Sequence, residues 1–467
     1  MGKAEEYLDQ IPMWTRKKNS LQDVRALLEA MGSPDRRIPA IHVAGTNGKG
    51  SVCAFLTSVF REAGYKTGTF ISPHLVEIRE RFLINGRMAD SQAVEESFER
   101  VLSAARAMME KGYCHPTFFE FLFYMAMDLF EREKVDIMII ETGLGGRLDT
   151  TNVLEHPLAA VITSISKDHT AYLGNTIAEI AGEKAGIVKP GVPVIYDGSD
   201  EEASRVIEHA AVEKNSPRIP VGQDDFVIKA IRSGQMEISA RMMDGKALNL
   251  LIPFEARYQA ENAMLAVRTL EVLQGNFSKA APGTKTPAAG TELSASEMPP
   301  SLTGLRLPRP ITAAHLTEGV KKTLWPGRME QARPGIYLDG AHNPGGIRAF
   351  LETAKEIRER QEKKAYLLFA AVSDKDYEVM AEELTQGMEW AAIGVVHMNS
   401  DRGLSAGLLA ELFRKHASCQ VTSYEDTGQA LADMERRAEG GLLFCAGSLY
   451  LIGEIKACMK KGSSGIS

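Results

Sequence analysis

The sequence predicts an α/β protein of two domains, each with a mostly parallel sheet covered by helices on both faces. Short apolar runs alternate with helical patterns from about residue 38 to residue 197, which is typical of β-α-β units. The same alternation resumes after residue 327 and continues almost to the end of the chain. We therefore expect an N-terminal domain over residues 1–326 and a smaller C-terminal α/β domain over residues 327–467.

The composition supports folded domains and argues against several classes of partner. Of the 467 residues, 44% are hydrophobic and 25% are charged, as in ordinary globular proteins. The formal net charge of −7 gives no reason to expect a nucleic-acid partner. The most apolar long stretch, residues 118–130, is too short to span a bilayer and contains two acidic residues. The five cysteines are scattered and odd in number, so we expect reduced thiols and a cytoplasmic protein without a membrane anchor.

The first segment that carries chemistry is a glycine-rich loop between a strand and a helix. Residues 41–44 form an apolar run, residues 45–51 read Gly-Thr-Asn-Gly-Lys-Gly-Ser, and Val52 is expected to open a helix. Backbone N–H groups in such a loop converge on a polyphosphate, and the helix N-terminus adds partial positive charge. Lys49 would reach the β- and γ-phosphates, and the Ser51 hydroxyl would bind Mg²⁺. Gly50 separates these two residues, unlike in the common pattern, and a plain turn is the alternative interpretation.

The remaining elements follow from hydrophobic periodicity. In the N-terminal domain we expect helices within residues 4–31, 91–111, 117–133 and 177–186, and strands within residues 64–71, 135–140, 159–163 and 192–196. An antiparallel ribbon (226–253), a helix (255–273), a flexible Ala/Pro/Ser/Thr/Gly-rich insertion (275–310) and a helix (313–323) come next. In the C-terminal domain the predicted strands lie within residues 336–339, 365–372, 393–397 and 442–446.

Polar residues collect where predicted strands end. Lys49, Ser72, Glu141 and His169 each follow a different apolar run. The carboxyl ends of parallel strands meet at one edge of the sheet, and ligands bind there. A carboxylate such as Glu141, directly after a buried strand, is costly to place unless it has a partner. A lone His169 would more often be a structural side chain, but its place among the other three residues favours a metal ligand.

Several motifs together resemble a known family. They are Gly45–Ser51, Ser72-Pro-His-Leu75, Glu141-Thr-Gly-Leu-Gly-Gly-Arg-Leu-Asp149, Asp168-His169, Glu183-Lys-Ala-Gly-Ile187, Gly327-Arg-Met-Glu330, Leu338-Asp-Gly-Ala-His-Asn-Pro344 and Gly447-Ser-Leu-Tyr450. In this order they resemble the folylpolyglutamate synthase/dihydrofolate synthase family, the folate branch of the Mur ligases. The resemblance runs from about residue 4 to residue 457, outside the insertion. It implies a three-layer ATP-binding domain with a P-loop, a smaller Rossmann-like domain, and an active site between them.

The resemblance also implies a reaction and a set of site residues. Members activate a carboxylate as an acyl phosphate, which the amino group of L-glutamate attacks to form an amide, so the γ-phosphate must be neutralised and held in line. Lys49 and two Mg²⁺ ions would supply that charge, and His342 would lie near the γ-phosphate. The implied metal ligands are Ser51, Ser72, Glu141, His169 and Lys184. The implied nucleotide contacts are Thr46, Asn47, Gly48, Lys49, Gly50, Ser51, Asn262, Arg328 and Asp339, with Gln259 near the base.

Lys184 is the most unusual of these assignments. Its ordinary helical surroundings alone favour a solvated surface lysine. The resemblance implies instead that its amine is N-carboxylated by CO₂ and becomes an anionic ligand of the second Mg²⁺. That functional interpretation rests wholly on the resemblance.

The residues that would bind the folate and the glutamate are predicted less specifically. The segments implied to face the folate contain Ser72, Pro73, His74, Arg81, Phe119, Arg147 and Asp149. Residues 374–376 and Arg402 are either solvated loops or part of the glutamate site. The resemblance implies a monomer. The sequence leaves open whether dihydropteroate is accepted as well as reduced folates, and how long the polyglutamate is.

Two other functions remain open. A Mur-type ligase of peptidoglycan precursors shares the glycine loop and the lysine ligand, but about 40 residues before the loop leave little room for its usual additional domain. A non-catalytic ATP-binding regulator would be expected to have lost some of Glu141, His169, Lys184 and His342, and all four are present.

Overall fold

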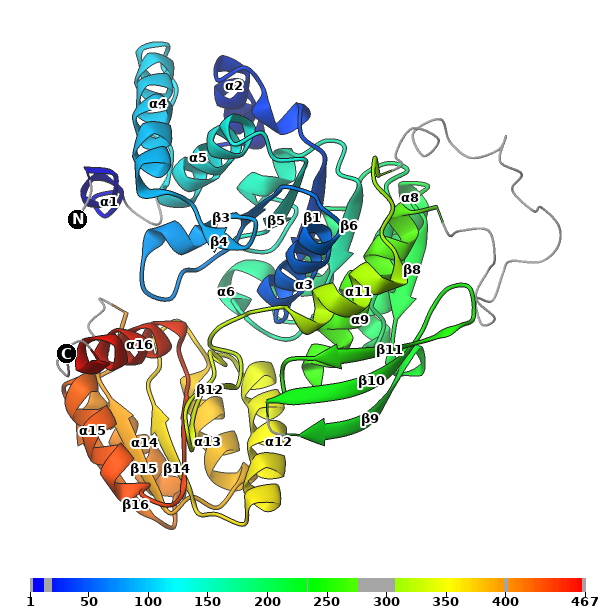
Figure 1. Cartoon of the computed structure of the whole chain (residues 1–467). Helices are drawn as coiled ribbons and strands as arrows, with labels where there is room; N and C mark the ends of the chain where they lie inside the picture. Colours follow the sequence, from blue (N-terminus) through cyan, green and yellow to red (C-terminus); the bar gives the residue numbers. More distant parts are fainter. Residues whose placement is uncertain (1–2, 12–18, 233, 276–306, 399–401, 464–467) are drawn as a thin grey trace.

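The N-terminal part of the chain is built on one eight-stranded sheet. A computed structural model describes residues 3–11, 19–232, 234–275, 307–398 and 402–463 (Figure 1). The strand order is β4-β3-β2-β5-β1-β6-β7-β8; the pairs β2–β3 and β3–β4 are antiparallel and the other pairs are parallel. The bounds are β1 (Ala40–Ala44), β2 (Thr67–Phe70), β3 (Phe82–Ile84), β4 (Arg87–Met88), β5 (Ile137–Glu141), β6 (Ala159–Ile162), β7 (Val194–Asp197) and β8 (Arg218–Val221).

Helices cover both faces of this sheet, because its central strands are apolar on both sides. Ile41 and Val43 of β1 face a core formed with α3 (Lys49–Glu62), α9 (Tyr258–Leu273) and α11 (Ala313–Lys321). Ala40 faces the opposite core, which contains α1 (Lys3–Leu8), α2 (Leu21–Ala30), α4 (Ser91–Glu110) and α5 (Phe118–Arg132). A smaller core packs α7 (Ile177–Ala185) and α8 (Glu201–Glu213) on β6 and β7. The predicted three-layer architecture is confirmed.

Short elements complete this domain. A four-residue helix, α6 (Thr170–Leu173), follows His169, and single 3₁₀ turns span Pro34–Arg36, Ile78–Arg81, Thr150–Val153 and Gln223–Asp225. The predicted ribbon is confirmed as the antiparallel sheet β11-β10-β9, formed by β9 (Phe226–Arg232), β10 (Gln235–Arg241) and β11 (Ala247–Ile252). Residues 276–306 of the predicted insertion lie outside the described residues.

A second, six-stranded sheet forms the C-terminal part. Its order is β12-β13-β17-β14-β15-β16, with β12 antiparallel and the other strands parallel. The bounds are β12 (Glu330–Arg333), β13 (Ile336–Leu338), β14 (Ala365–Phe369), β15 (Ala392–Val396), β16 (Gln420–Tyr424) and β17 (Leu442–Ala446). Helices α12 (Pro344–Gln361), α13 (Tyr377–Gly387) and α14 (Ala406–His416) cover one face, and α15 (Thr427–Arg437) and α16 (Leu449–Ser463) cover the other.

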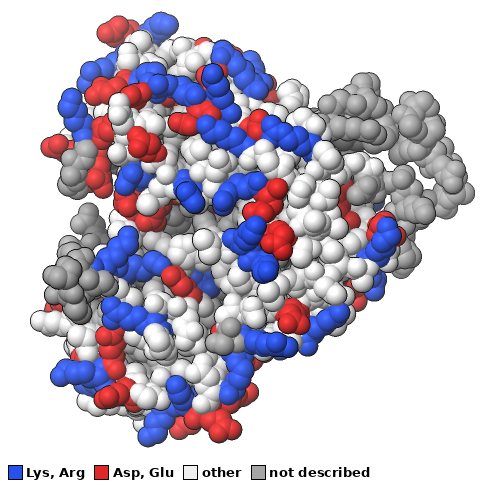
Figure 2. Space-filling model, in the orientation of Figure 1, with Lys and Arg blue, Asp and Glu red and all other residues white. Residues whose placement is uncertain are grey.

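The two parts meet along α12. Figure 1 shows α12 beside the β9–β11 sheet, and ion pairs join Arg257 to Glu356 and Arg360 to the buried Glu255. The face shown in Figure 2 mixes Lys and Arg with Asp and Glu. Among the described helices, none is both long and apolar enough to cross a membrane.

Candidate active site

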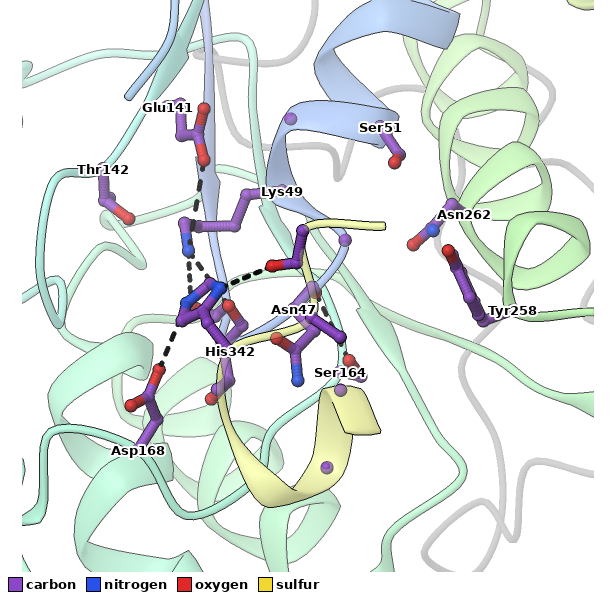
Figure 3. A pocket seen from close by; sticks show the side chains of 18 of the residues that line it. Asn47, Lys49, Ser51, Glu141, Thr142, Ser164, Asp168, Tyr258, Asn262 and His342 are labelled. Atoms are coloured by element: carbon purple, nitrogen blue, oxygen red, sulfur yellow. Dashed lines mark hydrogen bonds and ion pairs between the residues drawn. The ribbon is translucent and has the colours of Figure 1, made fainter. Parts of the chain in front are cut away.

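A cavity lies where the carboxyl ends of β1, β2, β5 and β6 meet the start of α12 (Figure 3). Its volume is about 220 Å³, and both domains line it. Most of the predicted site residues are brought together here: Thr46, Asn47, Gly48, Lys49, Gly50, Ser51, Ser72, Pro73, Glu141, His169, Lys184, Asn262, Arg328, Asp339 and His342. The prediction that strand-end residues converge is therefore confirmed.

The glycine-rich loop turns sharply from β1 into α3. Gly48 has a φ of +90°, a conformation that side chains other than glycine rarely adopt. A Cβ on Gly45 would lie 1.8 Å from Oγ1 of Thr163, so this loop packs tightly against the end of β6. Helix α3 begins at Lys49, not at Val52 as predicted, so Ser51 lies in its first turn. Lys49 Nζ donates to the carbonyl oxygens of Gly45 (3.2 Å) and Thr46 (3.1 Å).

Glu141 ends β5 beside this lysine and is buried. Its Oε2 accepts a bond from the backbone N–H of Ser72 at 3.1 Å, and its Oε1 lies 4.0 Å from Lys49 Nζ. Burial raises the pKa of the carboxyl, while Lys49 acts against that shift.

The side-chain oxygens near Glu141 are of the kind that binds Mg²⁺. Besides Glu141, the Ser51 hydroxyl accepts a bond from Gln259 Nε2 at 3.2 Å and keeps a second lone pair. Mg²⁺ is usually held by one or two protein oxygens together with substrate phosphates and water, so this small donor set fits the ion. Among the described residues, no group of three His, Cys, Asp or Glu side chains is arranged as a metal site.

Lys184 is buried, in contrast to the solvated lysine that its local sequence favours. It is 3% exposed, and its Nζ donates to the carbonyl oxygen of Gly45 at 2.8 Å. Helix α7 packs on the loop after β5, where the Arg147 N–H donates to the carbonyl of Glu183 at 2.7 Å. This packing turns Lys184 toward the glycine-rich loop. Burial, with the nearby charge of Lys49, lowers the pKa of Lys184 to about 7.

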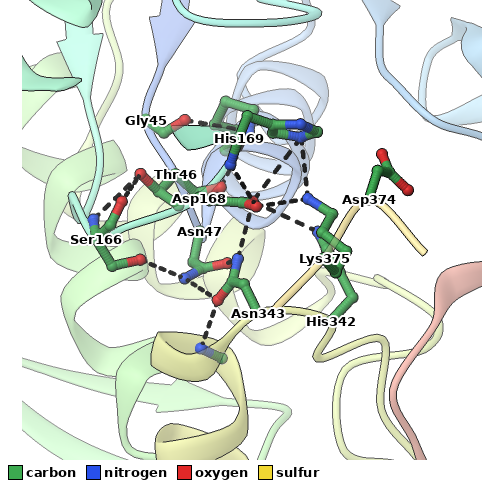
Figure 4. Close-up of polar contacts among 12 residues, drawn as sticks. Gly45, Thr46, Asn47, Ser166, Asp168, His169, His342, Asn343, Asp374 and Lys375 are labelled. Carbon is green, nitrogen blue, oxygen red and sulfur yellow. Dashed lines mark hydrogen bonds and ion pairs between the residues drawn. The ribbon is translucent and has the colours of Figure 1, made fainter. Parts of the chain in front are cut away.

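Asp168 is the centre of a polar cluster shared by the two domains (Figure 4). It accepts bonds from Lys375 Nζ (2.6 Å) and Asn343 Nδ2 (3.1 Å), both from the C-terminal part. The Nε2 atoms of His169 and His342 each lie 3.9 Å from its Oδ2. Burial alone would raise the pKa of Asp168, but Lys375 and the two histidines hold it below its ordinary value. The carboxyl is therefore an anion that ties the domains together.

Both histidines of the cluster are neutral near pH 7. Burial lowers the pKa of each to about 4, with the Lys375 charge acting in the same direction. His342 Nδ1 is 2.7 Å from the carbonyl oxygen of Gly340, so Nδ1 carries the proton and Nε2 has a lone pair. His169 Nε2 lies 3.0 Å from Lys375 Nζ. For His169 to bind a metal through this atom, the ammonium of Lys375 must move away.

A reciprocal pair of amides joins the glycine-rich loop to the second domain. Asn47 Nδ2 donates to Asn343 Oδ1 at 3.2 Å, and Asn343 Nδ2 donates to Asn47 Oδ1 at 3.0 Å. Asn343 also caps α12, since its Oδ1 accepts from the N–H of Gly346 at 2.7 Å. No local sequence pattern indicates this pair, because it joins residues of the two domains that are far apart in the chain.

Tyr258, Asn262, Arg328 and Asp339 also line the cavity. Buried Asp339 accepts bonds from the N–H groups of Met329 (2.7 Å) and Ala341 (2.8 Å) and from the Tyr258 hydroxyl (3.1 Å). Asn262 packs on Gly48 and donates to Gln259 Oε1 at 3.1 Å. Gln259 itself is fully buried, donates to Ser51 and is not among the lining residues, and its place near the base stays a prediction.

Five of the predicted substrate residues lie outside the cavity lining. His74 and Arg81 contact each other beside it, and Phe119 packs between Phe70 and Gly143. Exposed Arg147 pairs with Glu183, and buried Asp149 accepts bonds from the N–H groups of Leu144 (2.7 Å) and Thr151 (3.0 Å). Their roles toward a substrate stay predictions.

Trp325, in the segment between the domains, packs against the glycine-rich loop. A Cβ on Gly50 would lie 2.3 Å from Cζ2 of its ring. The indole Nε1 is buried and has no hydrogen-bond partner among the described residues, so the contact depends on shape. This explains why glycine stands between Lys49 and Ser51, where the common pattern has none.

Replacing Gly50 by alanine is expected to weaken the binding of a non-hydrolysable ATP analogue about ten-fold, since overpacking of this kind costs on the order of 1–3 kcal/mol. Shortening Trp325 to leucine removes the ring atoms that the new methyl group would meet. The double variant Gly50→Ala/Trp325→Leu should therefore recover most of the lost affinity in calorimetric titrations. If the single and double variants lost the same affinity, the loss would come from a change in the loop and not from the contact with Trp325.

Comparisons with known proteins agree with this arrangement. The Mur ligase middle domain matches residues 43–270, and the Mur ligase glutamate ligase domain matches residues 327–449. A dihydrofolate synthase/folylpolyglutamate synthase of Bacillus subtilis (strain 168) is 33% identical over 451 residues, covering 95% of each chain.

Solved structures give the same result. The folylpolyglutamate synthase of Mycobacterium tuberculosis complexed with ADP and AMPPCP has a TM-score of 0.81 at 25% identity, covering 97% of each chain. The folylpolyglutamate synthase of Thermotoga maritima has a TM-score of 0.78 at 27% identity, covering 98% of this chain and 96% of that chain. The chain therefore belongs to the folylpolyglutamate synthase/dihydrofolate synthase family of the Mur ligases.

Proposed function

We propose that this protein is an ATP-dependent ligase that joins a carboxylate of a folate to the amino group of L-glutamate. The observation that carries the proposal is the convergence of the phosphate-binding loop, Glu141, Lys184 and His342 in one cavity shared by both domains. We infer that dihydropteroate is a second acceptor, since relatives over nearly the whole chain include a protein named for both activities. We also place the domain boundary between residues 326 and 327, and expect a cytoplasmic monomer.

The proposed reaction has two steps. A carboxylate oxygen of the folate attacks the γ-phosphorus of ATP, the bond to the bridging oxygen breaks, and ADP leaves. The neutral glutamate nitrogen then attacks the acyl carbon, the C–O bond breaks, and phosphate leaves with that electron pair and takes up the proton that the nitrogen releases. Lys49 and the N-terminus of α3 hold the phosphates, and Arg328 approaches them from the second domain. His342 Nε2 accepts a hydrogen bond from the incoming amine.

We further propose that Glu141 and Ser51 hold one Mg²⁺, and that His169, Ser72 and N-carboxylated Lys184 hold a second with Glu141. These residues would hold the ions where bound Mg²⁺ would neutralise the γ-phosphate and the developing charge on the acyl oxygens. The structure supports the lysine assignment through its burial and its lowered pKa, because only a neutral amine reacts with CO₂. Lys375 would leave His169 when that metal binds.

Activation by bicarbonate should depend on pH. Carboxylation joins the neutral Lys184 amine to CO₂ and releases a proton, and the neutral fraction rises through the pKa of about 7. In enzyme stripped of CO₂, added bicarbonate should therefore restore more activity at about pH 8 than at about pH 6. The check is the initial rate of ADP release at each pH, before and after adding bicarbonate. Equal restoration at both pH values would argue against carboxylation of this lysine.

The function itself is tested by amide formation from ATP, Mg²⁺ and isotopically labelled L-glutamate. Tetrahydrofolate and dihydropteroate are offered separately as acceptors. Incorporation with both would establish a bifunctional synthase, and incorporation with tetrahydrofolate alone would restrict the protein to polyglutamylation. Incorporation with neither, by folded protein that binds ATP, would refute the folate assignment and favour a Mur-type substrate.

A further inference from the structure

Gln259 is a buried amide directly behind Ser51. It lies on α9, is fully shielded from solvent and is not among the residues that line the cavity. Its Nε2 donates to Oγ of Ser51 at 3.2 Å, and its Oε1 accepts from Nδ2 of Asn262 at 3.1 Å. Because both polar atoms of the amide are hydrogen-bonded, its orientation is fixed. The amide therefore presents an N–H group to Ser51 and no lone pair.

Ser51 differs from other buried hydroxyls on the two helices. Thr57 of α3 and Thr269 of α9 each donate to the carbonyl oxygen four residues earlier in their helix, at 2.7 Å in both cases. This bond to the preceding turn is common for hydroxyl side chains inside helices. In the part of the chain that the structure describes, the Ser51 hydroxyl bonds to Gln259 only. The side chain is therefore held by another helix and not by its own.

The direction of this bond leaves the rest of the hydroxyl available to the cavity. A serine hydroxyl has one O–H donor and two lone pairs, and the Gln259 amide occupies one lone pair. The second lone pair can bind a cation, and the O–H can donate to a phosphate oxygen. Ser51 and Asn262 both line the cavity (Figure 3). A carbonyl oxygen in place of the amide N–H would instead accept the hydroxyl proton and turn it away from the cavity.

Helix packing alone does not require an amide at this position. A buried amide is costly unless its polar atoms are hydrogen-bonded, and an apolar side chain avoids that cost. Helices α3 and α9 already contribute apolar residues to one core, among them Val52, Phe55, Ala263 and Val267. The polar contact occurs in the first turn of α3, where Ser51 lies. Its position therefore points to the hydroxyl and not to the helix interface.

We propose that Gln259 is a positioning residue that holds the Ser51 hydroxyl in the orientation that binds Mg²⁺. This inference rests on the proposed function, in which Ser51 binds the ion beside the ATP phosphates. Asn262 packs on Gly48 of the glycine-rich loop and fixes the Gln259 amide in turn. Residues that lie behind a metal ligand commonly orient it through one hydrogen bond in this way. Gln259 then acts on the metal through Ser51.

The test measures Mn²⁺ binding, in place of Mg²⁺, by electron paramagnetic resonance of the free ion. The full-length protein is saturated with a non-hydrolysable ATP analogue. Gln259→Met keeps the length of the side chain but has no donor, and it should weaken Mn²⁺ binding about ten- to a hundred-fold. Ser51→Ala should weaken it at least as much. Adding Gln259→Met to Ser51→Ala should cause no further loss, because Gln259 acts only through that hydroxyl.

Thr269→Val is the matched control. It removes another buried polar group of α9, one that bonds within its own helix, and should leave Mn²⁺ affinity within about two-fold of the wild type. A second measurement separates orientation of the ligand from support of the loop. Binding of the analogue without metal, in the presence of a chelator, should change little in Gln259→Met. An equal loss with and without metal would overturn the proposal, since Gln259 would then support the loop as a whole.

The other outcomes are equally decisive. Unchanged Mn²⁺ affinity in Gln259→Met, or a further loss when it is added to Ser51→Ala, would overturn the role of Gln259. If Gln259→Met does not fold, Gln259→Leu takes its place in the same comparison and is judged by the same results. If wild-type protein binds the analogue but no Mn²⁺, the proposed metal site and the role of Gln259 are both refuted. Amide formation by the same preparation then shows whether the proposed ligase function fails as well.

Discussion

Replacing Lys184 by alanine is expected to reduce the rate of amide formation about 10²–10³-fold, with little change in the binding of ATP. This is the loss typical when a group that stabilises developing charge is removed from a closed site. The side chain is buried, contacts the carbonyl of Gly45 and lies near the charges of Lys49 and Asp168. The measurement is ADP release at saturating ATP, tetrahydrofolate and L-glutamate.

Lys189 provides the matched control for this variant. It is also a lysine whose pKa burial lowers, and its Nζ donates to the carbonyl of Asn152 at 2.9 Å, but it does not line the cavity. Lys189→Ala should keep activity within about two-fold of the wild type even if it is less stable. Similar losses in the two variants would mean that Lys184 acts only through folding. Lys184→Met, which keeps the buried volume, should be as inactive as Lys184→Ala.

The second large effect is expected for Lys49→Met, which should lower kcat/KM for ATP about 10²–10³-fold. In the present structure Nζ of Lys49 is held by two loop carbonyls and lies 4.0 Å from Glu141, at the end of the cavity where we place the γ-phosphate. Without the positive charge of Lys49, the negative charge of the buried Glu141 carboxyl would repel the phosphates. Steady-state kinetics with varied ATP measures the change.

Lys322 serves as the comparison for Lys49. It is exposed, pairs with Glu62 at 2.7 Å and lies at the far end of α3. Lys322→Met should change kcat/KM by less than about two-fold, because exposed ion pairs contribute little. If Lys49→Met also retained nearly full activity, the glycine-rich loop would not be the phosphate site.

Sequence patterns were sufficient wherever the signal is local. The apolar run before Gly45, the glycine-rich loop and the polar residues that end β5 and β6 are contiguous features, and parallel pairing then brings their ends together. Elements at the edges of the two sheets were not predicted because their composition is polar. In the C-terminal sheet, the edge strand β16 reads Gln-Val-Thr-Ser-Tyr and the edge strand β12 reads Glu-Gln-Ala-Arg. In the N-terminal sheet, helix α8 leads to the edge strand β8, which is largely exposed.

Contacts between segments that are distant in the chain could not be predicted from the sequence. The burial of Lys184 depends on how α7 packs on the loop after β5, and the fit of Trp325 on Gly50 depends on the path of the interdomain segment. The pairing of Lys375 with Asp168 exists only in the closed arrangement of the domains. From the chain alone, Lys375 was equally consistent with a solvated loop.

We propose that the γ-phosphate of ATP is transferred in this cavity to a folate carboxylate before the amide forms. The most direct measurement uses tetrahydrofolate whose γ-carboxylate carries heavy oxygen, with ATP, Mg²⁺ and L-glutamate, and follows the label by mass spectrometry. We expect each turnover to place one heavy oxygen in the released phosphate and to add one glutamyl residue to the folate. Phosphate free of the label, released while amide accumulates, would contradict it.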